Sequence, residues 1–288
     1  MPLSTAQHPA RGIALVVVAT LCFALLDTTS QYVGPVVPVV MAVWLRYVTQ
    51  TAMTVAMLWP RRGRTLLHTR APGWQFARGV LMVGSSAVAF IALRHVPVGE
   101  FTAIMMLVPL AVTLMASLML RERVPALTWW LVAGGLLGAL IVIRPKGSDF
   151  QGVLLLPLLL VLVNAAYQIM TSHMVRTEDP GTMHFYTGFF GLVCFTALLP
   201  WSWVPLGSWT WWALTALLGV LGSIGHYLLI QAYNHAPAAR LTPYLYAQIA
   251  FATLAGWVVF GYAPDGWSVA GIALIALCGA LGVRRHRG

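Results

Sequence analysis

The sequence predicts an all-α integral membrane protein with ten transmembrane helices, arranged as two inverted five-helix repeats around a central cavity. Its composition is 59% hydrophobic and 8% charged, with a mean hydropathy of +0.81. So few charges would leave a soluble core uncovered, whereas a spanning helix needs about 20 mainly apolar residues. Helices are expected rather than a β-barrel, because a helix satisfies its own backbone hydrogen bonds in lipid, and no alternating segments of about ten residues are visible.

An internal repeat supports this organisation. The segment A-L-R-H-V-P-V-G-E-F-T, residues 92–102, returns 140 residues later as A-Y-N-H-A-P-A-A-R-L-T, residues 232–242. The matching His and Pro positions inside this short window carry the most weight, because chance supplies scattered identities in so apolar a chain. With five helices in each copy, an odd number, the second copy enters the membrane upside down relative to the first.

The parts of the chain follow from this repeat. They are a cytoplasmic N-terminal segment (1–12), a first repeat (13–144), an outer connecting loop (145–151), a second, inverted repeat (152–283) and a basic cytoplasmic tail (284–288). The expected helices are bounded by turn residues such as Gly34-Pro35 and Asp179-Pro180-Gly181. They span residues 13–33, 39–59, 74–93, 98–120, 127–143, 152–174, 182–199, 209–231, 238–260 and 267–283. Pro109 and Pro243 are expected to kink the helices that contain them.

The distribution of basic residues predicts the orientation. With the N-terminus inside, the cytoplasmic segments hold twelve Arg or Lys residues and the outer loops hold three, Arg94, Arg144 and Lys146. Basic residues in short loops favour the cytoplasm, so both termini are predicted to be cytoplasmic. The net charge of +10 then reflects contact with anionic lipid and requires no nucleic acid. Arg78, near the inner end of the third helix, is expected to extend toward the membrane surface in the same way.

Inverted repeats are typical of transporters, which place a substrate near the bilayer midplane between the two copies and alternate between inward-open and outward-open shapes. An enzyme is not expected. The sequence shows no Cys/His metal spacing, no Ser nucleophile with a base at helical distance and no Gly-rich phosphate loop. The three cysteines lie singly in apolar helices and suit packing roles. No metal and no cofactor are predicted.

Several motifs resemble one known family. They are Arg46 in the second helix, the A-x-x-H-x-P turn that enters the fourth helix, and its exit L-R-E-R-V-P at residues 120–125. With the inverted five-helix copies, the chain resembles the drug/metabolite transporter superfamily, EamA-type branch, and most of all its bacterial amino-acid and metabolite exporters. The resemblance implies a bacterial inner-membrane exporter with a basket-like cavity lined by the first four helices of each copy.

Polar side chains identify helices that line a cavity. In the sixth helix, Asn164, Tyr167, Gln168 and Thr171 are spaced i, i+3, i+4, i+7 and share one face. The equivalent face of the first helix holds Ala24, Asp27, Thr28 and Gln31. Such matched stripes indicate a shared lumen, and the alternative is that these groups bond only to neighbouring helices. The fifth and tenth helices are almost free of polar side chains and are expected at the periphery.

Further candidates lie in the third, eighth and ninth helices. They are Ser86, its repeat partner His226, and the tyrosines Tyr227 and Tyr246. His226 is either a proton relay or a neutral histidine bonded to a carbonyl oxygen, and the second role is the more common one for a lone histidine in a helix.

Two charges are expected to meet inside the membrane. Asp27 and Arg46 lie within about 2 Å of the same depth at a rise of 1.5 Å per residue. They form either a permanent salt bridge or a clamp that opens to hold the ammonium and carboxylate groups of a zwitterion. With so few fixed cations, a phosphate substrate is disfavoured, and small amino acids or similar metabolites are expected. Alternatives are an exporter of lipophilic or drug-like compounds, a channel or a scramblase, and the chain is expected to be a monomer or a homodimer.

The orientation has a direct test. In a variant without Cys22, Cys194 and Cys278, a single cysteine introduced by Arg64→Cys should resist a membrane-impermeant maleimide in intact cells and react after the membrane is permeabilised. This follows from the Arg/Lys imbalance. A Ser148→Cys variant should react from outside and serves as the control. Labelling of position 64 in intact cells would reverse the predicted topology.

Overall fold

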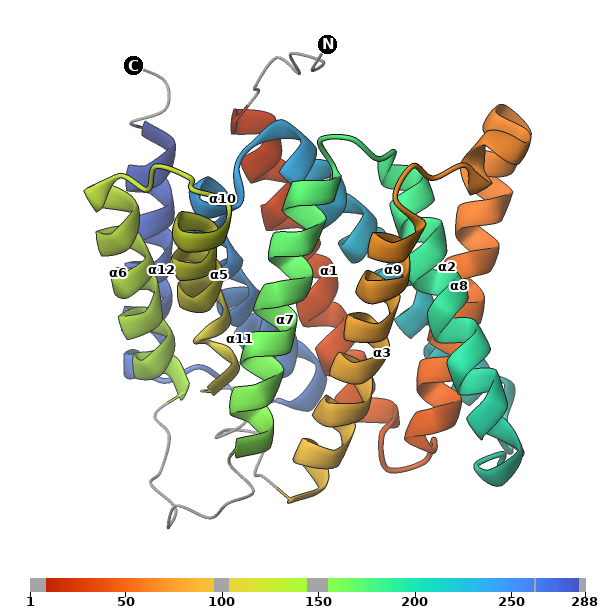
Figure 1. The fold of residues 1–288 in the computed structure, drawn as a ribbon. Coiled ribbons are helices and arrows are strands. Elements are labelled where there is room, and N and C mark those ends of the chain that lie inside the picture. Colours follow the sequence, from red (N-terminus) through yellow and green to blue (C-terminus); the bar gives the residue numbers. More distant parts are fainter. Residues whose placement is uncertain (1–8, 96–103, 144–154, 262, 285–288) are drawn as a thin grey trace.

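The computed structural model describes residues 9–95, 104–143, 155–261 and 263–284. Within these ranges it consists of helices and the turns between them (Figure 1). The first half contains α1 (Pro9–Val33), α2 (Val39–Arg62), η1 (Gly63–Leu67), α3 (Pro72–His95), α5 (Val108–Met119) and α6 (Ala126–Ile143). The second half contains α7 (Leu155–Met174), α8 (Pro180–Leu198), η3 (Leu199–Trp201), α9 (Trp209–His235), α10 (Ala238–Leu245), α11 (Ala247–Phe260) and α12 (Gly266–Arg284).

The described helices form ten spans, which confirms the predicted fold class. Five helical stretches are long and apolar enough to cross a membrane, with α2 continuing into η1, α8 into η3, and α10 into α11. Four shorter apolar helices lie in α5, α6, α7 and α12, and α3 completes the set. The predicted turn at residues 97–99 and the cations Arg144 and Lys146 lie outside the described residues.

The two halves pack as inverted equivalents. By repeat position, α1 is equivalent to α7, α3 to α9, and α5 to α10 and α11. The α1–α9 contact therefore has its equivalent in the α7–α3 contact, and the α1–α11 contact has its equivalent in the α7–α5 contact. The α2–α8 and α6–α12 contacts each join a helix to its own equivalent. The start of α1 and the end of α12 lie at the same end of the bundle, called the terminal face below (top in Figure 1). This is the arrangement that two inverted copies of five spans require.

Two spans are interrupted close to a proline. In the fourth span the chain turns at residues 106–107, and Pro109 is the second residue of α5. Proline has no N–H for the preceding turn of a helix and clashes with its carbonyl, which accounts for this interruption. The ninth span is divided between α10 and α11 at Tyr246, so the helix continues through Pro243 and the break follows three residues later.

The start of α8 is fixed by Asp179. Its Oδ1 accepts hydrogen bonds from the N–H groups of Gly181 at 2.8 Å and Thr182 at 3.0 Å, and Pro180 occupies the first helical position. The same carboxylate forms an ion pair with Arg62 at the end of α2. One short side chain therefore caps a helix of the second half and joins it to the first.

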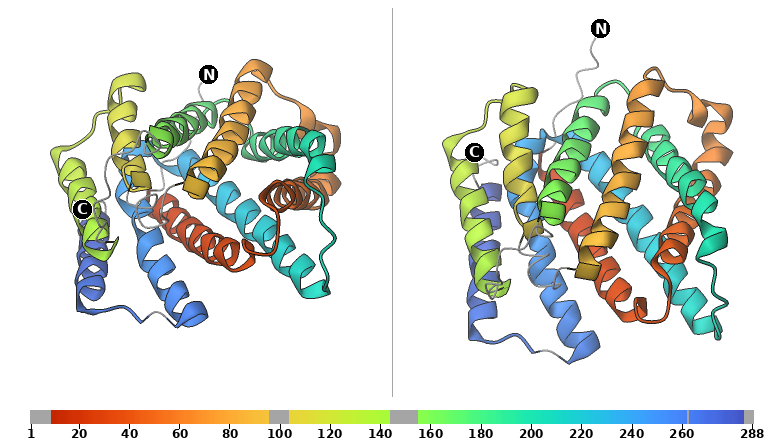
Figure 2. Two further views of the ribbon diagram at one scale, coloured as in Figure 1. Left: turned by 90° about the horizontal axis from the view of Figure 1, so that it is seen from below. Right: turned by 60° about the horizontal axis from the view of Figure 1, so that its bottom comes forward.

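Helices α6 and α12 form a pair at the edge of the bundle (Figure 2). A Cβ atom at Gly138 would lie 2.8 Å from the carbonyl oxygen of Gly271, and a Cβ atom at Gly271 would lie 2.6 Å from that of Gly138. The backbones therefore cross at these two glycines. In a bilayer, burying apolar side chains between helices gives no hydrophobic stabilisation, because the lipid tails are equally apolar. Close van der Waals packing at small residues therefore contributes much of the helix association.

This crossing predicts the effect of a larger side chain. Gly138→Leu should lower the stability of the purified protein by about 1–3 kcal/mol and reduce Tm by several degrees, because the backbones would have to separate. Gly256→Leu is the matched control, since a Cβ atom at this helical glycine of α11 meets nothing within 4 Å. Thermal unfolding in detergent gives the comparison. Equal Tm values for the two variants would show that the crossing does not hold α6 to α12.

Candidate functional site

Inside the bundle, Arg46 of α2 forms a hydrogen bond with His226 of α9. Nη2 of Arg46 lies 2.9 Å from Nε2 of His226. A guanidinium group only donates, so Nε2 of His226 accepts and the imidazole is neutral. A Cβ atom at position 222 would lie 2.9 Å from Nε of Arg46, so Gly222 lets α9 approach the guanidinium group. Nε of Arg46 is buried without a hydrogen-bond partner among the described residues and leaves one donor free.

Aromatic rings surround this pair. The rings of Phe23 in α1 and Tyr167 in α7 stand edge-on to the imidazole of His226, with centroids 5.0 Å and 6.4 Å away. The Arg46 guanidinium carbon lies 5.7 Å from the centroid of the Tyr47 ring. We call these five residues the central cluster. Its members come from both halves of the chain, which is what a site between two repeats requires.

Ser86 of α3 adjoins the central cluster. Its hydroxyl donates to the carbonyl oxygen of Met82 at 3.0 Å and accepts from the hydroxyl of Tyr47, 3.1 Å away. Ser86 is the repeat equivalent of His226, and the structure places both beside the Arg46–Tyr47 segment of α2. These candidates of the sequence analysis therefore lie in one region.

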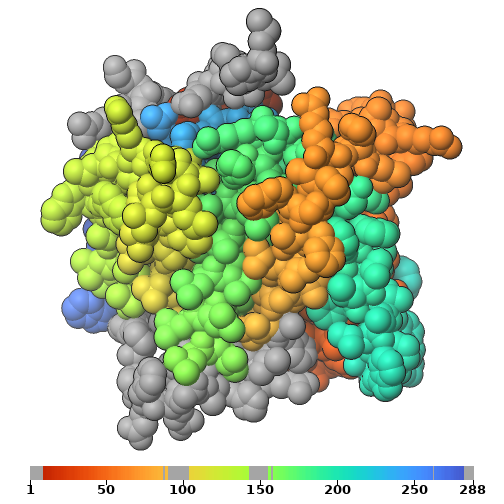
Figure 3. Space-filling model, in the orientation of Figure 1, coloured from red at the N-terminus to blue at the C-terminus, as the bar shows by residue number. Residues whose placement is uncertain are grey.

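Arg78 is buried, and the expectation that it extends to the membrane surface is wrong. It is 0% exposed. Its Nη2 donates to Thr187 Oγ1 at 2.7 Å and to Tyr167 Oη at 3.1 Å. Its Nη1 donates to Gln75 Oε1 and to the Met183 carbonyl oxygen, both at 3.3 Å. Four neutral acceptors within reach of α3 stabilise the charge inside the bundle better than extension through the apolar surface does. In Figure 3 the atoms of α3 and α7 occupy the middle of the face turned toward the viewer.

A second histidine lies close by in α8. His184 Nε2 is 3.0 Å from Ser223 Oγ, and Gln50 Nε2 donates to the His184 carbonyl oxygen at 3.3 Å. The His184 ring stands edge-on to Tyr227, 5.5 Å between centroids, and the Tyr227 hydroxyl accepts from Gln231 Nε2 at 2.9 Å. Among the described residues, no group of three or more His, Cys, Asp or Glu side chains is placed to hold a metal ion.

The polar stripe of α7 is partly engaged in helix contacts. Gln168 is buried; its Nε2 donates to Asn164 Oδ1 at 2.8 Å, and its Oε1 accepts from Tyr233 of α9 at 2.6 Å. The Thr171 hydroxyl donates to the carbonyl oxygen of Tyr167 in its own helix. Asn164 is half-buried, and among the described residues its amide nitrogen makes no hydrogen bond. The stripe thus both links α7 to α9 and presents Asn164 and Tyr167 to the interior.

The predicted direct contact between Asp27 and Arg46 is wrong for this structure. Oδ2 of Asp27 accepts from Nε2 of Gln248 in α11 at 2.8 Å, while Arg46 binds His226. The ion pairs among the described residues do not include Asp27, although the Arg46 charge is close enough to act on its carboxylate. Asp27 and Gln31 of α1 are both exposed. Equal depth was therefore insufficient, because each side chain points to a different neighbouring helix.

Tyr246 lies apart from the other candidates. It is 0% exposed, packs with Val132 and Ala139 of α6, and donates to the carbonyl oxygen of Met106 at 3.2 Å. Its position at the break between α10 and α11 explains this. The interrupted helix turns the side chain toward the peripheral pair.

Several residues of the site were missed by the sequence analysis. They are Phe23, Tyr47, Gln50, His184, Thr187, Tyr233 and the buried Arg78. One signal was present, since Gln75 and Arg78 are three residues apart and share a face of α3. Phe23 gave no signal, because aromatic residues in a lipid-embedded helix are common on any face.

At the terminal face, three acidic residues join the two halves. Asp179 pairs with Arg62. Glu178 accepts from Thr69 Oγ1 at 2.6 Å, the Arg70 N–H at 2.8 Å and Gln75 Nε2 at 3.2 Å. Glu122 accepts from Arg176 at 3.2 Å and from the Ala239 N–H at 3.3 Å. Burial raises the pKa of the Glu122 carboxyl, and the Ala239 N–H and Arg176 oppose this rise. The bundle is thus held together between halves at this end.

A scan against protein-family models gives two matches along the chain, to the EamA-like transporter family, at residues 10–144 and 151–284. The chain belongs to the EamA-like transporter family. It is therefore a multi-pass membrane protein that transports small molecules and not an enzyme, as expected. The two matched segments correspond to the two packed halves of the bundle.

Among curated proteins, this EamA-like transporter is similar to riboflavin transporters of Vibrio cholerae and Rhizobium johnstonii. The first is 30% identical over 282 residues, 96% of this chain and 93% of the relative. The second is 31% identical over 284 residues, 94% of this chain and 91% of the relative. A pseudopaline exporter of Pseudomonas aeruginosa is 24% identical, covering 94% of this chain and 95% of the relative. The expected amino-acid export finds no support among these relatives.

A solved crystal structure has the same fold as this EamA-like transporter. The TM-score is 0.81 at 20% sequence identity, and the match covers 97% of this chain and 99% of the other. This similarity bears on the fold alone.

The hydrogen bonds of Arg78 predict that loss of the Thr187 hydroxyl lowers stability more than loss of another buried threonine hydroxyl. Thr187→Val keeps the shape of the side chain and removes the 2.7 Å acceptor, which should lower stability by about 1.5–3 kcal/mol because the donor is charged and buried. Thr171→Val is the matched control, since its buried hydroxyl bonds only to the carbonyl oxygen of its own helix. Thermal unfolding of both variants provides the measurement. A loss for Thr171→Val as large as that for Thr187→Val would contradict this role of Arg78.

Proposed function

We propose that this chain transports riboflavin or a closely related flavin across the membrane. The observation that carries the proposal is the similarity to two riboflavin transporters, at 30% and 31% identity over more than nine tenths of every chain compared. The similarity includes both repeats, so it extends over all helices that contribute to the central cluster.

The chemistry of the central cluster suits such a substrate. Riboflavin joins a flat, uncharged three-ring system to a chain of hydroxyl groups. The half-buried Phe23 can offer its ring to a flat substrate, while Tyr47 and Tyr167 are buried and pack around Arg46 and His226. The neutral polar groups of Ser86 and Asn164, both half-buried, suit the hydroxyl chain. A site of aromatic rings and a few placed polar groups is the usual form of a small-molecule pocket.

We assign Arg46 the role of orienting the ring. Its Nε has no hydrogen-bond partner among the described residues, and its Nη2 binds the neutral His226. The pyrimidine edge of a flavin carries two carbonyl oxygens, which accept hydrogen bonds from a guanidinium group. A charged donor in a low-dielectric interior strengthens such a bond, because water does not compete there.

The contacts at the terminal face support alternating access between the halves. Arg62–Asp179, Glu122–Arg176 and the bonds of Glu178 all cross from one half to the other. We propose that they close this end of the pathway and separate when the substrate is exchanged there. The half-exposed Arg62–Asp179 pair is weak enough to be exchanged for water repeatedly, whereas Glu178 and Glu122 are largely buried and must be hydrated when this end opens.

Transport by the purified protein in liposomes tests the proposal. Vesicles loaded with unlabelled riboflavin should accumulate radiolabelled riboflavin by counterflow, and excess unlabelled riboflavin outside should compete. A mixture of neutral amino acids should not compete. Accumulation of labelled amino acids without accumulation of riboflavin would overturn the assignment.

The proposed role of Arg46 predicts that transport falls even when lysine keeps the positive charge at this position. Arg46→Lys should reduce the counterflow rate about tenfold or more, because lysine lacks the planar fork of donors and a hydrogen bond from a charged group is worth about 1.5–3 kcal/mol. Arg64→Lys, at an exposed position of η1, is the control and should transport normally. If Arg46→Lys is folded and fully active, the guanidinium group does not bind the substrate.

A zwitterionic amino acid remains the second candidate, favoured by one observation. Asp27 and Arg46 are held by the neutral partners Gln248 and His226 and not by each other, so a ligand with both charges has two groups to neutralise. In that case, labelled neutral amino acids should exchange in the same vesicles, and Asp27→Asn should abolish this exchange. Absence of exchange by the unmodified protein would exclude this candidate.

A further inference from the structure

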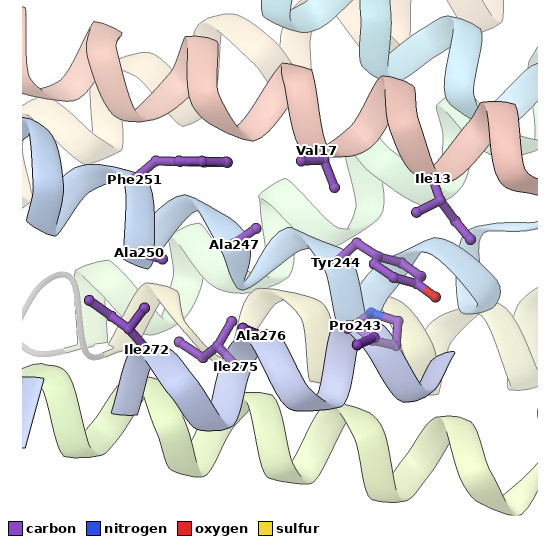
Figure 4. A pocket seen from close by; sticks show the side chains of 12 residues that line it. Ile13, Val17, Pro243, Tyr244, Ala247, Ala250, Phe251, Ile272, Ile275 and Ala276 are labelled. Atoms are coloured by element: carbon purple, nitrogen blue, oxygen red, sulfur yellow. The ribbon is translucent and has the colours of Figure 1, made fainter. Parts of the chain in front are cut away.

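An apolar crevice lies between α1, α10/α11 and α12, away from the central cluster (Figure 4). Its volume is about 330 Å³. The walls come from three places in the fold: Ile13 and Val17 of α1; Pro243, Tyr244, Ala247, Ala250 and Phe251 of α10 and α11; and Ile272, Ile275, Ala276, Gly279 and Ala280 of α12. Helix α12 packs along α6 and only lightly against α10 and α11, which leaves this space open. Exposed Ala276 and Ala280 show that the crevice reaches the lipid-facing surface.

One buried polar group points into this apolar space. Tyr244 is 5% exposed, and its hydroxyl has no hydrogen-bond partner among the described residues. Figure 4 shows its oxygen at the Ile13 end of the crevice, which is the end nearer the terminal face. A buried hydroxyl without a partner is unfavourable, so a ligand with a polar group at this end would gain a hydrogen bond there.

Basic residues extend from the same helices at that end. Arg11 lies two residues before Ile13, Arg240 lies three residues before Pro243, and Arg284 is the last residue of α12. Among the described residues, the side chains of Arg11 and Arg240 have no ion-pair or hydrogen-bond partner. Arg240 lies four residues before Tyr244 on the same face of α10, and its charge acts on the Tyr244 hydroxyl. The end of the crevice nearer the terminal face is therefore flanked by positive charge.

The length of the crevice fits one half of a bilayer. On α12 it extends from Ile272 to Ala280, about 12 Å at 1.5 Å per residue. A single leaflet has a hydrocarbon thickness of about 15 Å. The apolar walls thus lie at the depth of acyl chains, and the arginines lie at the depth of head groups.

We propose that this crevice binds an anionic phospholipid, with one acyl chain between α1, α11 and α12 and its phosphate near Arg11 and Arg240. The Tyr244 hydroxyl donates to a phosphate or ester oxygen of the same lipid. The site is independent of the flavin assignment. Its walls come from both halves, so the bound lipid fills the space that the peripheral pair leaves beside the bundle.

Native mass spectrometry of the full chain tests the site with phosphatidylglycerol and phosphatidylcholine as probes. One phosphatidylglycerol should remain bound at detergent concentrations that remove phosphatidylcholine. The double variant Arg11→Gln/Arg240→Gln should weaken this retention about thirtyfold, since each basic residue near anionic lipid contributes about fivefold to the affinity. Arg64→Gln/Arg123→Gln removes the same charge from exposed positions and should retain the lipid. Equal retention of both lipids, or an equal loss in the two double variants, would overturn the proposal.

A second measurement uses the unmodified protein. A phosphatidylglycerol with a photoreactive acyl chain should label the peptides that contain residues 243–251 and 272–280, and Ala276→Phe, which fills the crevice, should remove this labelling. Labelling spread evenly over the exposed apolar surface would show that the lipid occupies no particular site. Unchanged labelling in a folded Ala276→Phe variant would place the lipid elsewhere.

Discussion

Two guanidinium groups inside an apolar bundle impose the main constraint on this structure. A charge in the interior of a membrane protein is tolerated only where polar groups replace water. Arg78 receives four such groups from α3, α7 and α8, and Arg46 receives His226 from α9. All of these partners are neutral. The helices that supply them must therefore stay in register, while the interior keeps a positive charge that favours electron-rich ligands.

The constraint also separates an arginine that is enclosed by hydrogen-bond acceptors from one that is only partly enclosed. Arg78 uses both terminal nitrogens and is enclosed, so it acts as a fixed link among three helices. Nε lacks a hydrogen-bond partner among the described residues in both arginines, but Arg46 is only half-buried, and its partner His226 lies beside the rings of Phe23 and Tyr167. The same chemical group thus serves structure at one position and is available for binding at the other. The sequence analysis placed only Arg46 deep in the membrane, because Arg78 lies nearer the end of its helix.

The fold was predictable because its signals are long. Ten apolar runs, an odd number per repeat and prolines at fixed places determined the spans, and the turn just before Pro109 followed from the chemistry of proline. The site was less predictable, because the rise per residue gives the depth of a side chain but not the direction in which it points around the helix axis. Asp27 and Arg46 share a depth and point to different neighbours. Tyr246 carried the right chemistry and was turned toward α6 by the break beside it.

Asp179 has a further consequence for the kinetics of motion. Its carboxylate is held by two N–H groups of α8 and also meets Arg62. In the separation of the halves that we propose, the helix keeps its first turn and the acceptor stays in place. The carboxylate stays ordered by α8 while the halves are apart, so its conformational entropy is not lost again when they meet. Only the arginine side chain must then be immobilised. The time needed to re-form this contact is then set by the movement of whole helices and not by the refolding of a helix end.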